Sequence, residues 1–151
     1  MAVQNKTGLD PEAFKTRLKE HGLKATPQRI AVHEAMLSLV HATADEVAEW
    51  ISTNRKWVRI SSASIYNTLS QLALLGIYSH RLSADNKLHF DVWTSKHLHF
   101  YDWETDEFKD VIDEELFDMV ESKVKHKRFK GYHVDGVDIQ ILGHQIRRGG
   151  K

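Results

Sequence analysis

Apolar residues in the first half of the chain recur three or four positions apart, as expected for helices with one buried face. Asp10 before Pro11, and Thr26 before Pro27, each place a capping residue ahead of a proline, which is typical of a helix start. Thr43 and Glu46 have the spacing of a capping box. The sequence therefore predicts four helices, beginning near residues 11, 27, 43 and 61, with these apolar residues on their inner sides: Phe14, Leu18, Ile30, Val32, Ala35, Met36, Leu39, Val47, Trp50, Ile51, Ile65, Leu69 and Leu72.

The spacing changes after Gly76, where short runs suited to strands replace the helical period. Strands are predicted over 77–83 and 87–93 around a polar turn, and over 96–103 and 107–111 as a hairpin. Asp113 caps a further helix, and 131–144 ends the chain as a strand. A short extended segment is also expected over 56–60. The predicted fold class is α+β: an N-terminal winged helix-turn-helix over 1–84, then a small α/β domain over 85–151.

Composition narrows the class of protein only slightly. Lys+Arg and Asp+Glu both total 21, but residues 1–84 hold ten basic and seven acidic side chains, whereas 85–151 hold eleven and fourteen. The first part is thus net +3 and the second net −3, which hints that the first part contacts an anion. With no cysteine in the chain, disulfides, thiolate zinc sites and cysteine nucleophiles are excluded. With no signal peptide or membrane-length apolar run, we expect a soluble cytoplasmic protein.

The fourth predicted helix has a polar side suited to DNA. Its exposed face is expected to carry Ser62, Ser64, Tyr66, Asn67 and Ser70. Asparagine can pair with adenine, an aromatic ring can contact a thymine methyl, and hydroxyls at a helix start suit phosphate. In a winged helix-turn-helix this helix lies in the major groove. The alternative is an ordinary amphipathic helix whose polar residues are merely solvated.

A second group of residues has the chemistry of a metal site. His97 and His99 alternate along a predicted strand and so share one face, and the same parity places Asp91 on that side. Two histidines and one carboxylate suit Fe(II), Mn(II) or Zn(II). Asp110 on the returning strand can add a ligand, and His41 can join from the first part of the chain. The alternative is that these histidines are structural.

The segments "GLKATPQRIAV", "HATADEV", "ISSASIYNTLSQLALLGI", "HFDVWTSKHLHF" and "DEFKDV" stand in an order and spacing that resembles the ferric uptake regulator family of metal-dependent repressors. The resemblance covers roughly residues 14–146. It implies a homodimer, built from a winged-helix domain and a dimerisation domain, that binds AT-rich inverted repeats in double-stranded DNA when metal is bound.

Carried over residue by residue, the resemblance implies a regulatory metal site made of His41, Asp91, His97, His99 and Asp110. Tyr66 and Asn67 match base-reading positions, and Lys24 matches a basic residue that reaches the minor groove. With Lys24, Arg29 is expected to contact phosphates.

The chain departs from the family pattern at the structural zinc site. Most members hold that zinc with two Cys-x-x-Cys pairs, whereas this chain has Asp102 and Thr105 at the first pair and lacks cysteine near Gln145 for the second. No structural zinc held by four cysteines is therefore expected. The family's further His-rich sensing site is also expected to be absent, because Lys96, Leu98 and Val137 stand at its matching positions. The expectation is one divalent metal per protomer, Fe2+ or Mn2+, with Zn2+ also acceptable.

At position 110 this chain has an aspartate and not a glutamate, and in this it resembles the peroxide-sensing branch of the family. There, bound Fe(II) reacts with hydrogen peroxide and metal-bound histidines are oxidised, which releases DNA; the matching residues are His41 and His97. An iron- or haem-responsive regulator of the same family is an alternative. Two others are a non-haem iron enzyme using His97, His99 and a carboxylate, and a metal-independent DNA-binding protein. We expect a transcription regulator and not an enzyme.

Overall fold

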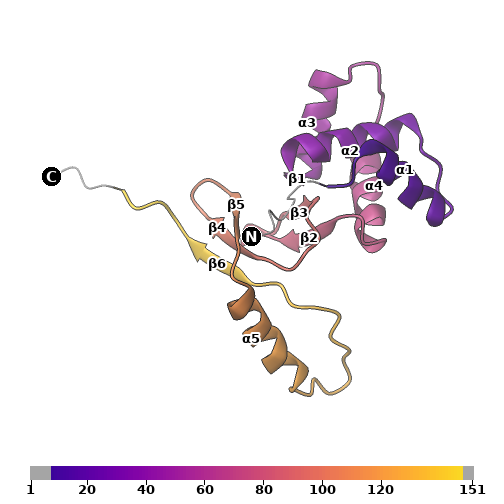
Figure 1. Cartoon of the computed structure of the whole chain (residues 1–151). Helices are drawn as coiled ribbons and strands as arrows, with labels where there is room; N and C mark the ends of the chain where they lie inside the picture. Colours follow the sequence, from indigo (N-terminus) through magenta and orange to yellow (C-terminus); the bar gives the residue numbers. More distant parts are fainter. Residues whose placement is uncertain (1–7, 148–151) are drawn as a thin grey trace. The chain divides into compact units, whose positions relative to one another are not determined.

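The computed structural model describes residues 8–147. It shows two compact units that divide between Thr94 and Ser95, and Figure 1 draws both. This division lies C-terminal to the boundary expected between 84 and 85. The reason is that the strand Leu88–Asp91 pairs with strands of the first unit on both of its edges.

Four helices make up most of the first unit: α1 (Pro11–Glu20), α2 (Pro27–Leu39), α3 (Ala44–Asn54) and α4 (Ser62–Leu74). Each begins with a side chain that accepts a hydrogen bond from a backbone N–H three residues on, and these caps are Asp10, Thr26, Thr43 and Ser61. Such a bond satisfies one of the four N–H groups that a helix start leaves unpaired. The four predicted helices are confirmed.

The helices bury their apolar faces against one another. Phe14 and Leu18 of α1, Val32 and Met36 of α2, and Leu69 of α4 are all at most 1% exposed. They belong to one continuous cluster that also takes in Ile77, Tyr78 and Phe90 from the sheet side. This core fixes which face of α4 remains at the surface.

A three-stranded antiparallel sheet completes the first unit as a winged helix-turn-helix. Its strands are β1 (His41–Thr43), β2 (Ser79–Leu82) and β3 (Leu88–Asp91), in the order β1-β3-β2. Strand β1 was not predicted, and its pairing sets His41 opposite Asp91. The extended segment predicted over 56–60 is wrong, since those residues form a turn and irregular chain.

The second unit holds β4 (Leu98–Asp102), β5 (Glu107–Val111), α5 (Glu114–Lys125) and β6 (Gln140–Gly143). Strand β4 is central, antiparallel to β5 and parallel to β6. The predicted hairpin and the helix capped by Asp113 are confirmed. The last strand is shorter than the predicted 131–144. At its end, a Cβ on Gly143 would overlap the ring of Phe100, so a glycine allows β6 to lie beside β4.

None of the helices in residues 8–147 combines the length and the apolar character needed to cross a bilayer.

A buried histidine connects α1, α2 and the chain before β2. The His33 ring stacks on Phe14 with ring centroids 3.9 Å apart. Its Nε2 lies 2.6 Å from the carbonyl oxygen of Leu9, and its Nδ1 lies 2.7 Å from the Tyr78 hydroxyl. A carbonyl can only accept, so Nε2 carries the hydrogen and Nδ1 accepts from Tyr78. The site is therefore built for a neutral imidazole.

We expect the free energy of unfolding to fall as the pH drops below 6.5, and His33 to contribute to that fall. Burial lowers the pKa of His33 from its ordinary value of 6.5, against the opposing effect of the bond to Leu9. The unfolded chain then binds the proton more readily, so stability is full above 6.5 and is lost below it. Urea denaturation of wild type and His33→Gln, on both sides of that pH, checks this.

The comparison between the two proteins isolates His33, because burial also lowers the pKa of His89 and acts in the same direction. His33→Gln is expected to be less stable at neutral pH and to show a shallower decline in acid. An equal decline in both proteins would show that the pKa of His33 is the same in the folded and the unfolded chain.

Candidate metal and DNA sites

The first set of candidate ligands is His41 with Asp91, in the first unit. The β1–β3 register places the two residues directly opposite each other. His41 Nδ1 lies 3.3 Å from Asp91 Oδ2. The other oxygen, Oδ1, accepts a hydrogen bond of 2.8 Å from the Trp93 backbone N–H. The carboxylate is thus held in one orientation, with Oδ2 turned toward the imidazole.

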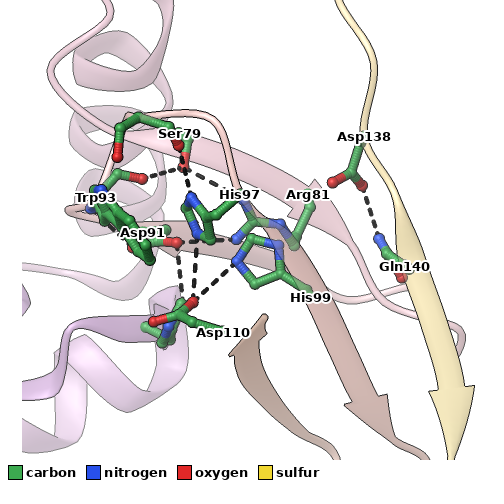
Figure 2. Close-up of polar contacts among 11 residues, drawn as sticks. Ser79, Arg81, Asp91, Trp93, His97, His99, Asp110, Asp138 and Gln140 are labelled. Carbon is green, nitrogen blue, oxygen red and sulfur yellow. Dashed lines mark hydrogen bonds and ion pairs between the residues drawn. The ribbon is translucent and has the colours of Figure 1, made fainter. Parts of the chain in front are cut away.

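Arg81 also contacts Asp91. Its Nη1 lies 3.2 Å from Asp91 Oδ2, and its Nη2 lies 3.4 Å from the Ser79 hydroxyl, as Figure 2 shows. Arg81 was not among the residues predicted from the sequence. The available signal was its place on β2 two residues after Ser79, which pairs with Asp91 across the sheet, so that the two share a face next to that carboxylate.

The second set of candidate ligands is His97, His99 and Asp110, in the second unit. His99 and Asp110 are paired residues of β4 and β5. The Nε2 atoms of His97 and His99 each lie 3.3 Å from the same oxygen, Asp110 Oδ1 (Figure 2). The two rings have centroids 4.3 Å apart. Three donor atoms therefore converge within one unit, as the alternation of His97 and His99 predicted.

The donor set in the second unit fits a divalent transition metal. His97 Nδ1 lies 2.6 Å from the Ser95 carbonyl oxygen and so carries the hydrogen, which leaves the Nε2 lone pair directed at the convergence point. Metal-binding histidines are typically oriented in this way through their second nitrogen. Imidazole and carboxylate donors suit Fe(II), Mn(II) and Zn(II).

The strand parity that linked Asp91 to the two histidines in the sequence does not relate them in the fold. Asp91 belongs to the sheet β1-β3-β2, whereas His99 belongs to β5-β4-β6. Five candidate ligands thus form two sets, two residues in the first unit and three in the second.

The predicted DNA-facing side of α4 lies at the surface. Ser62, Ser64 and Asn67 are exposed, and Tyr66 is 47% exposed. Ile65, Leu69 and Leu72 on the other side are buried in the core. These polar groups lie on the outer face of the helix, as predicted. Ser70 differs, because it is only partly exposed and its hydroxyl oxygen is buried.

A hollow of about 360 Å³ lies beside α4, between its N-terminus and that of α2. Arg29 and Arg59 both line it, together with hydroxyls from the helix caps. Arg29 donates from Nη1 to the Lys24 carbonyl at 2.9 Å, and the Lys24 side chain is exposed. Arg59 was not among the predicted residues. Its signal was a basic residue two positions before the Ser61 cap of the predicted DNA-reading helix.

The chain matches the model of the ferric uptake regulator family over residues 20–139. Among curated relatives, it is similar to the peroxide operon regulator of Bacillus subtilis, with 36% identity over 89 residues. That match covers 58% of this chain and 59% of the relative, so the chain spans less than two thirds of that relative's length.

Two solved structures share the fold. One is the ferric uptake regulator of Vibrio cholerae, with a TM-score of 0.70 and 20% identity, covering 87% of this chain and 99% of that one. The other is the peroxide stress regulator of Campylobacter jejuni, with a TM-score of 0.63 and 21% identity, covering 93% and 100%. Both of these solved proteins are regulators. The chain belongs to the ferric uptake regulator family.

Proposed function

We propose that the protein is a metal-dependent, sequence-specific DNA-binding repressor that acts as a homodimer in the cytoplasm. The observation that carries this proposal is the pair of ligand sets, one in the winged-helix unit and one in the β5-β4-β6 unit. A single ion that takes donors from both sets makes the arrangement of the two units depend on metal.

The proposed ligands are His41, Asp91, His97, His99 and Asp110, holding one divalent ion per protomer. Fe2+ and Mn2+ are the proposed ions, and Zn2+ is compatible with the same donors. With no cysteine in the chain, no four-cysteine zinc site stabilises the second unit, and packing and hydrogen bonds have to hold it. When bound, the ion supplies a positive charge shared by both units, and iron also supplies redox chemistry.

On DNA, we propose that α4 enters the major groove of an AT-rich inverted repeat. Tyr66 and Asn67 read base edges, while Ser62, Ser64, Lys24 and Arg29 contact the backbone. In a dimer the separation of the two α4 helices has to match the half-site spacing. Metal binding favours the arrangement with that separation. The resulting gain in DNA affinity is limited by how much more tightly the metal binds this arrangement than the others.

Within this function, we propose hydrogen peroxide as the signal. The similarity to a peroxide operon regulator and the aspartate at position 110 support this reading. His41 and His97 are the proposed targets of oxidation near bound iron. A regulator that responds to iron or haem remains the competing proposal for the same fold.

DNA binding measured by fluorescence anisotropy, with Mn(II) and then with EDTA, tests the proposal. We expect specific binding to an AT-rich inverted repeat with Mn(II), and its loss after chelation. Binding that survives EDTA would instead identify a metal-independent DNA-binding protein. Failure to bind any such repeat with Mn(II) would remove the repressor proposal.

The peroxide signal is tested separately, on protein loaded with Fe(II). After peroxide, mass spectrometry should find a gain of about 16 Da, one oxygen atom, on His41 and His97, together with loss of DNA binding. Unmodified histidines with DNA binding retained would favour an iron or haem sensor.

A further inference from the structure

Arg81 contacts the carboxylate of Asp91, a proposed metal ligand. Asp91 Oδ2 has two neighbours within the first unit, Arg81 Nη1 at 3.2 Å and His41 Nδ1 at 3.3 Å. The guanidinium is also held from Ser79. Arg81 and Asp91 are both buried, with side chains 6% and 0% exposed, so this is not a loose surface pair.

The orientation of Asp91 does not depend on Arg81 alone. The Trp93 backbone N–H holds Oδ1 at 2.8 Å, and the β1–β3 ladder holds the backbone of Asp91 opposite His41. Oδ2 is therefore the oxygen presented toward His41. A cation bound by Asp91 Oδ2 and His41 either shares that oxygen with the guanidinium or displaces it.

The positive charge of Arg81 strengthens this competition with the metal ion. Arg81 and Asp91 together are neutral, so this pair offers an arriving cation no net attraction. Two like charges that share one oxygen repel, and at a buried site this repulsion is much less screened than in water. The guanidinium is also permanently charged, and so deprotonation cannot relieve the repulsion.

We propose that Arg81 is an internal competitor for the metal: it neutralises Asp91 in the metal-free protein and raises the metal concentration at which the regulator is loaded. Arg81 is a positioning residue and not a ligand. Its effect is to set the threshold of the metal response. This inference rests on the proposed function, because it assumes that Asp91 binds the ion.

Mn(II) titration of the full-length protein against a fluorescent chelator tests the inference. Arg81→Met, which keeps much of the side-chain length and removes the charge, should bind Mn(II) at least about tenfold more tightly, equivalent to about 1.4 kcal/mol. Arg81→Lys, which keeps the charge, should remain closer to wild type. The Mn(II) concentration for half-maximal DNA binding should fall in Arg81→Met by the same factor.

Arg55→Met is the matched control. Arg55 also pairs with a carboxylate in the first unit, its Nε lying 2.5 Å from Glu34 Oε2, and neither residue is a proposed ligand. The control removes the same charge from the same unit and should leave Mn(II) affinity unchanged. An equal gain in both variants would reduce the effect of Arg81 to net charge and overturn the proposal.

A second measurement uses the metal-free protein, where Arg81 and Asp91 are expected to stabilise each other. The losses in melting temperature of Arg81→Met and Asp91→Asn should not add in the double variant, because each removes the same pair. If Arg81→Met does not fold, Arg81→Gln replaces it, with the same expected gain in Mn(II) affinity.

The results for Asp91→Asn and Arg81→Met distinguish failure of the Arg81 proposal from failure of the proposed metal site. If Asp91→Asn weakens Mn(II) binding while folded Arg81→Met binds no more tightly than wild type, only the inference about Arg81 fails. If Asp91→Asn leaves Mn(II) binding unchanged, Asp91 is not a ligand, and both the proposed site and the inference fail.

Discussion

Replacement of His99 by alanine is expected to weaken Mn(II) binding by at least about 100-fold, since the loss of an outer partner of a ligand already costs about 10- to 100-fold. His99 Nε2 is one of three donor atoms that converge in the second unit, 3.3 Å from Asp110 Oδ1. DNA binding at micromolar Mn(II) should disappear with it. Chelator competition and fluorescence anisotropy measure the two effects.

His133→Ala is the control for this experiment. His133 lies in the same unit, but its side chain is 89% exposed and it pairs with Asp135, outside the proposed ligand set. His133→Ala should bind Mn(II) and DNA as the wild-type protein does. Circular dichroism checks whether His99→Ala is folded. If it is not, His99→Gln replaces it in the experiment. A folded His99 variant with wild-type Mn(II) affinity would show that this histidine is structural.

Leu69→Ala is expected to lower the free energy of unfolding by about 2–5 kcal/mol, the range for truncating a buried leucine. Leu69 is fully buried on the inner face of α4, within the core shared with α1 and α2. The substitution removes apolar contacts and leaves a cavity that rigid neighbours fill only in part. Urea denaturation followed by circular dichroism measures the change.

The same substitution at Leu74 provides an internal comparison. Leu74 lies on the same helix but is 84% exposed, so Leu74→Ala should change stability by less than about 0.5 kcal/mol. Similar losses at the two positions would mean that the inner and outer faces of α4 are assigned wrongly, which would also undermine the proposed DNA face.

The helices of the winged-helix unit could be predicted because their signals are local. Asp10, Thr26 and Thr43 each accept the hydrogen bond that the sequence assigned to a helix start, and Ser61 does the same at the start of α4. The apolar spacing in α4 likewise predicted which of its residues face the core. Caps and apolar stripes act within a few residues, so a single sequence contains them.

The strands were harder to predict, because their pairing depends on distant residues. Strand β1 has three residues and exists because it pairs with β3, far along the chain. A last strand was predicted over 131–144, yet the residues paired with β4 begin at Gln140. The segment over 56–60 has strand-forming residues, but no strand in residues 8–147 pairs with it.

The candidate site divides in the same way. His97, His99 and Asp110 could be found from alternation and a hairpin, and the structure brings them together. His41 depended on the family resemblance, because only the unpredicted β1 sets it beside Asp91. Arg81 was missed because its role depends on a contact with Asp91 across the sheet. Neither residue spacing nor ligand chemistry predicts such a contact.

The β1–β3 ladder has one further consequence. Backbone hydrogen bonds hold His41 opposite Asp91, so the conformational entropy lost in aligning these two side chains is lost mainly when the domain folds. Little of that ordering is left for the moment of ion capture, which makes this half of the coordination shell preorganised. Amide hydrogen exchange in β1 should therefore be slow in EDTA as well as in Mn(II).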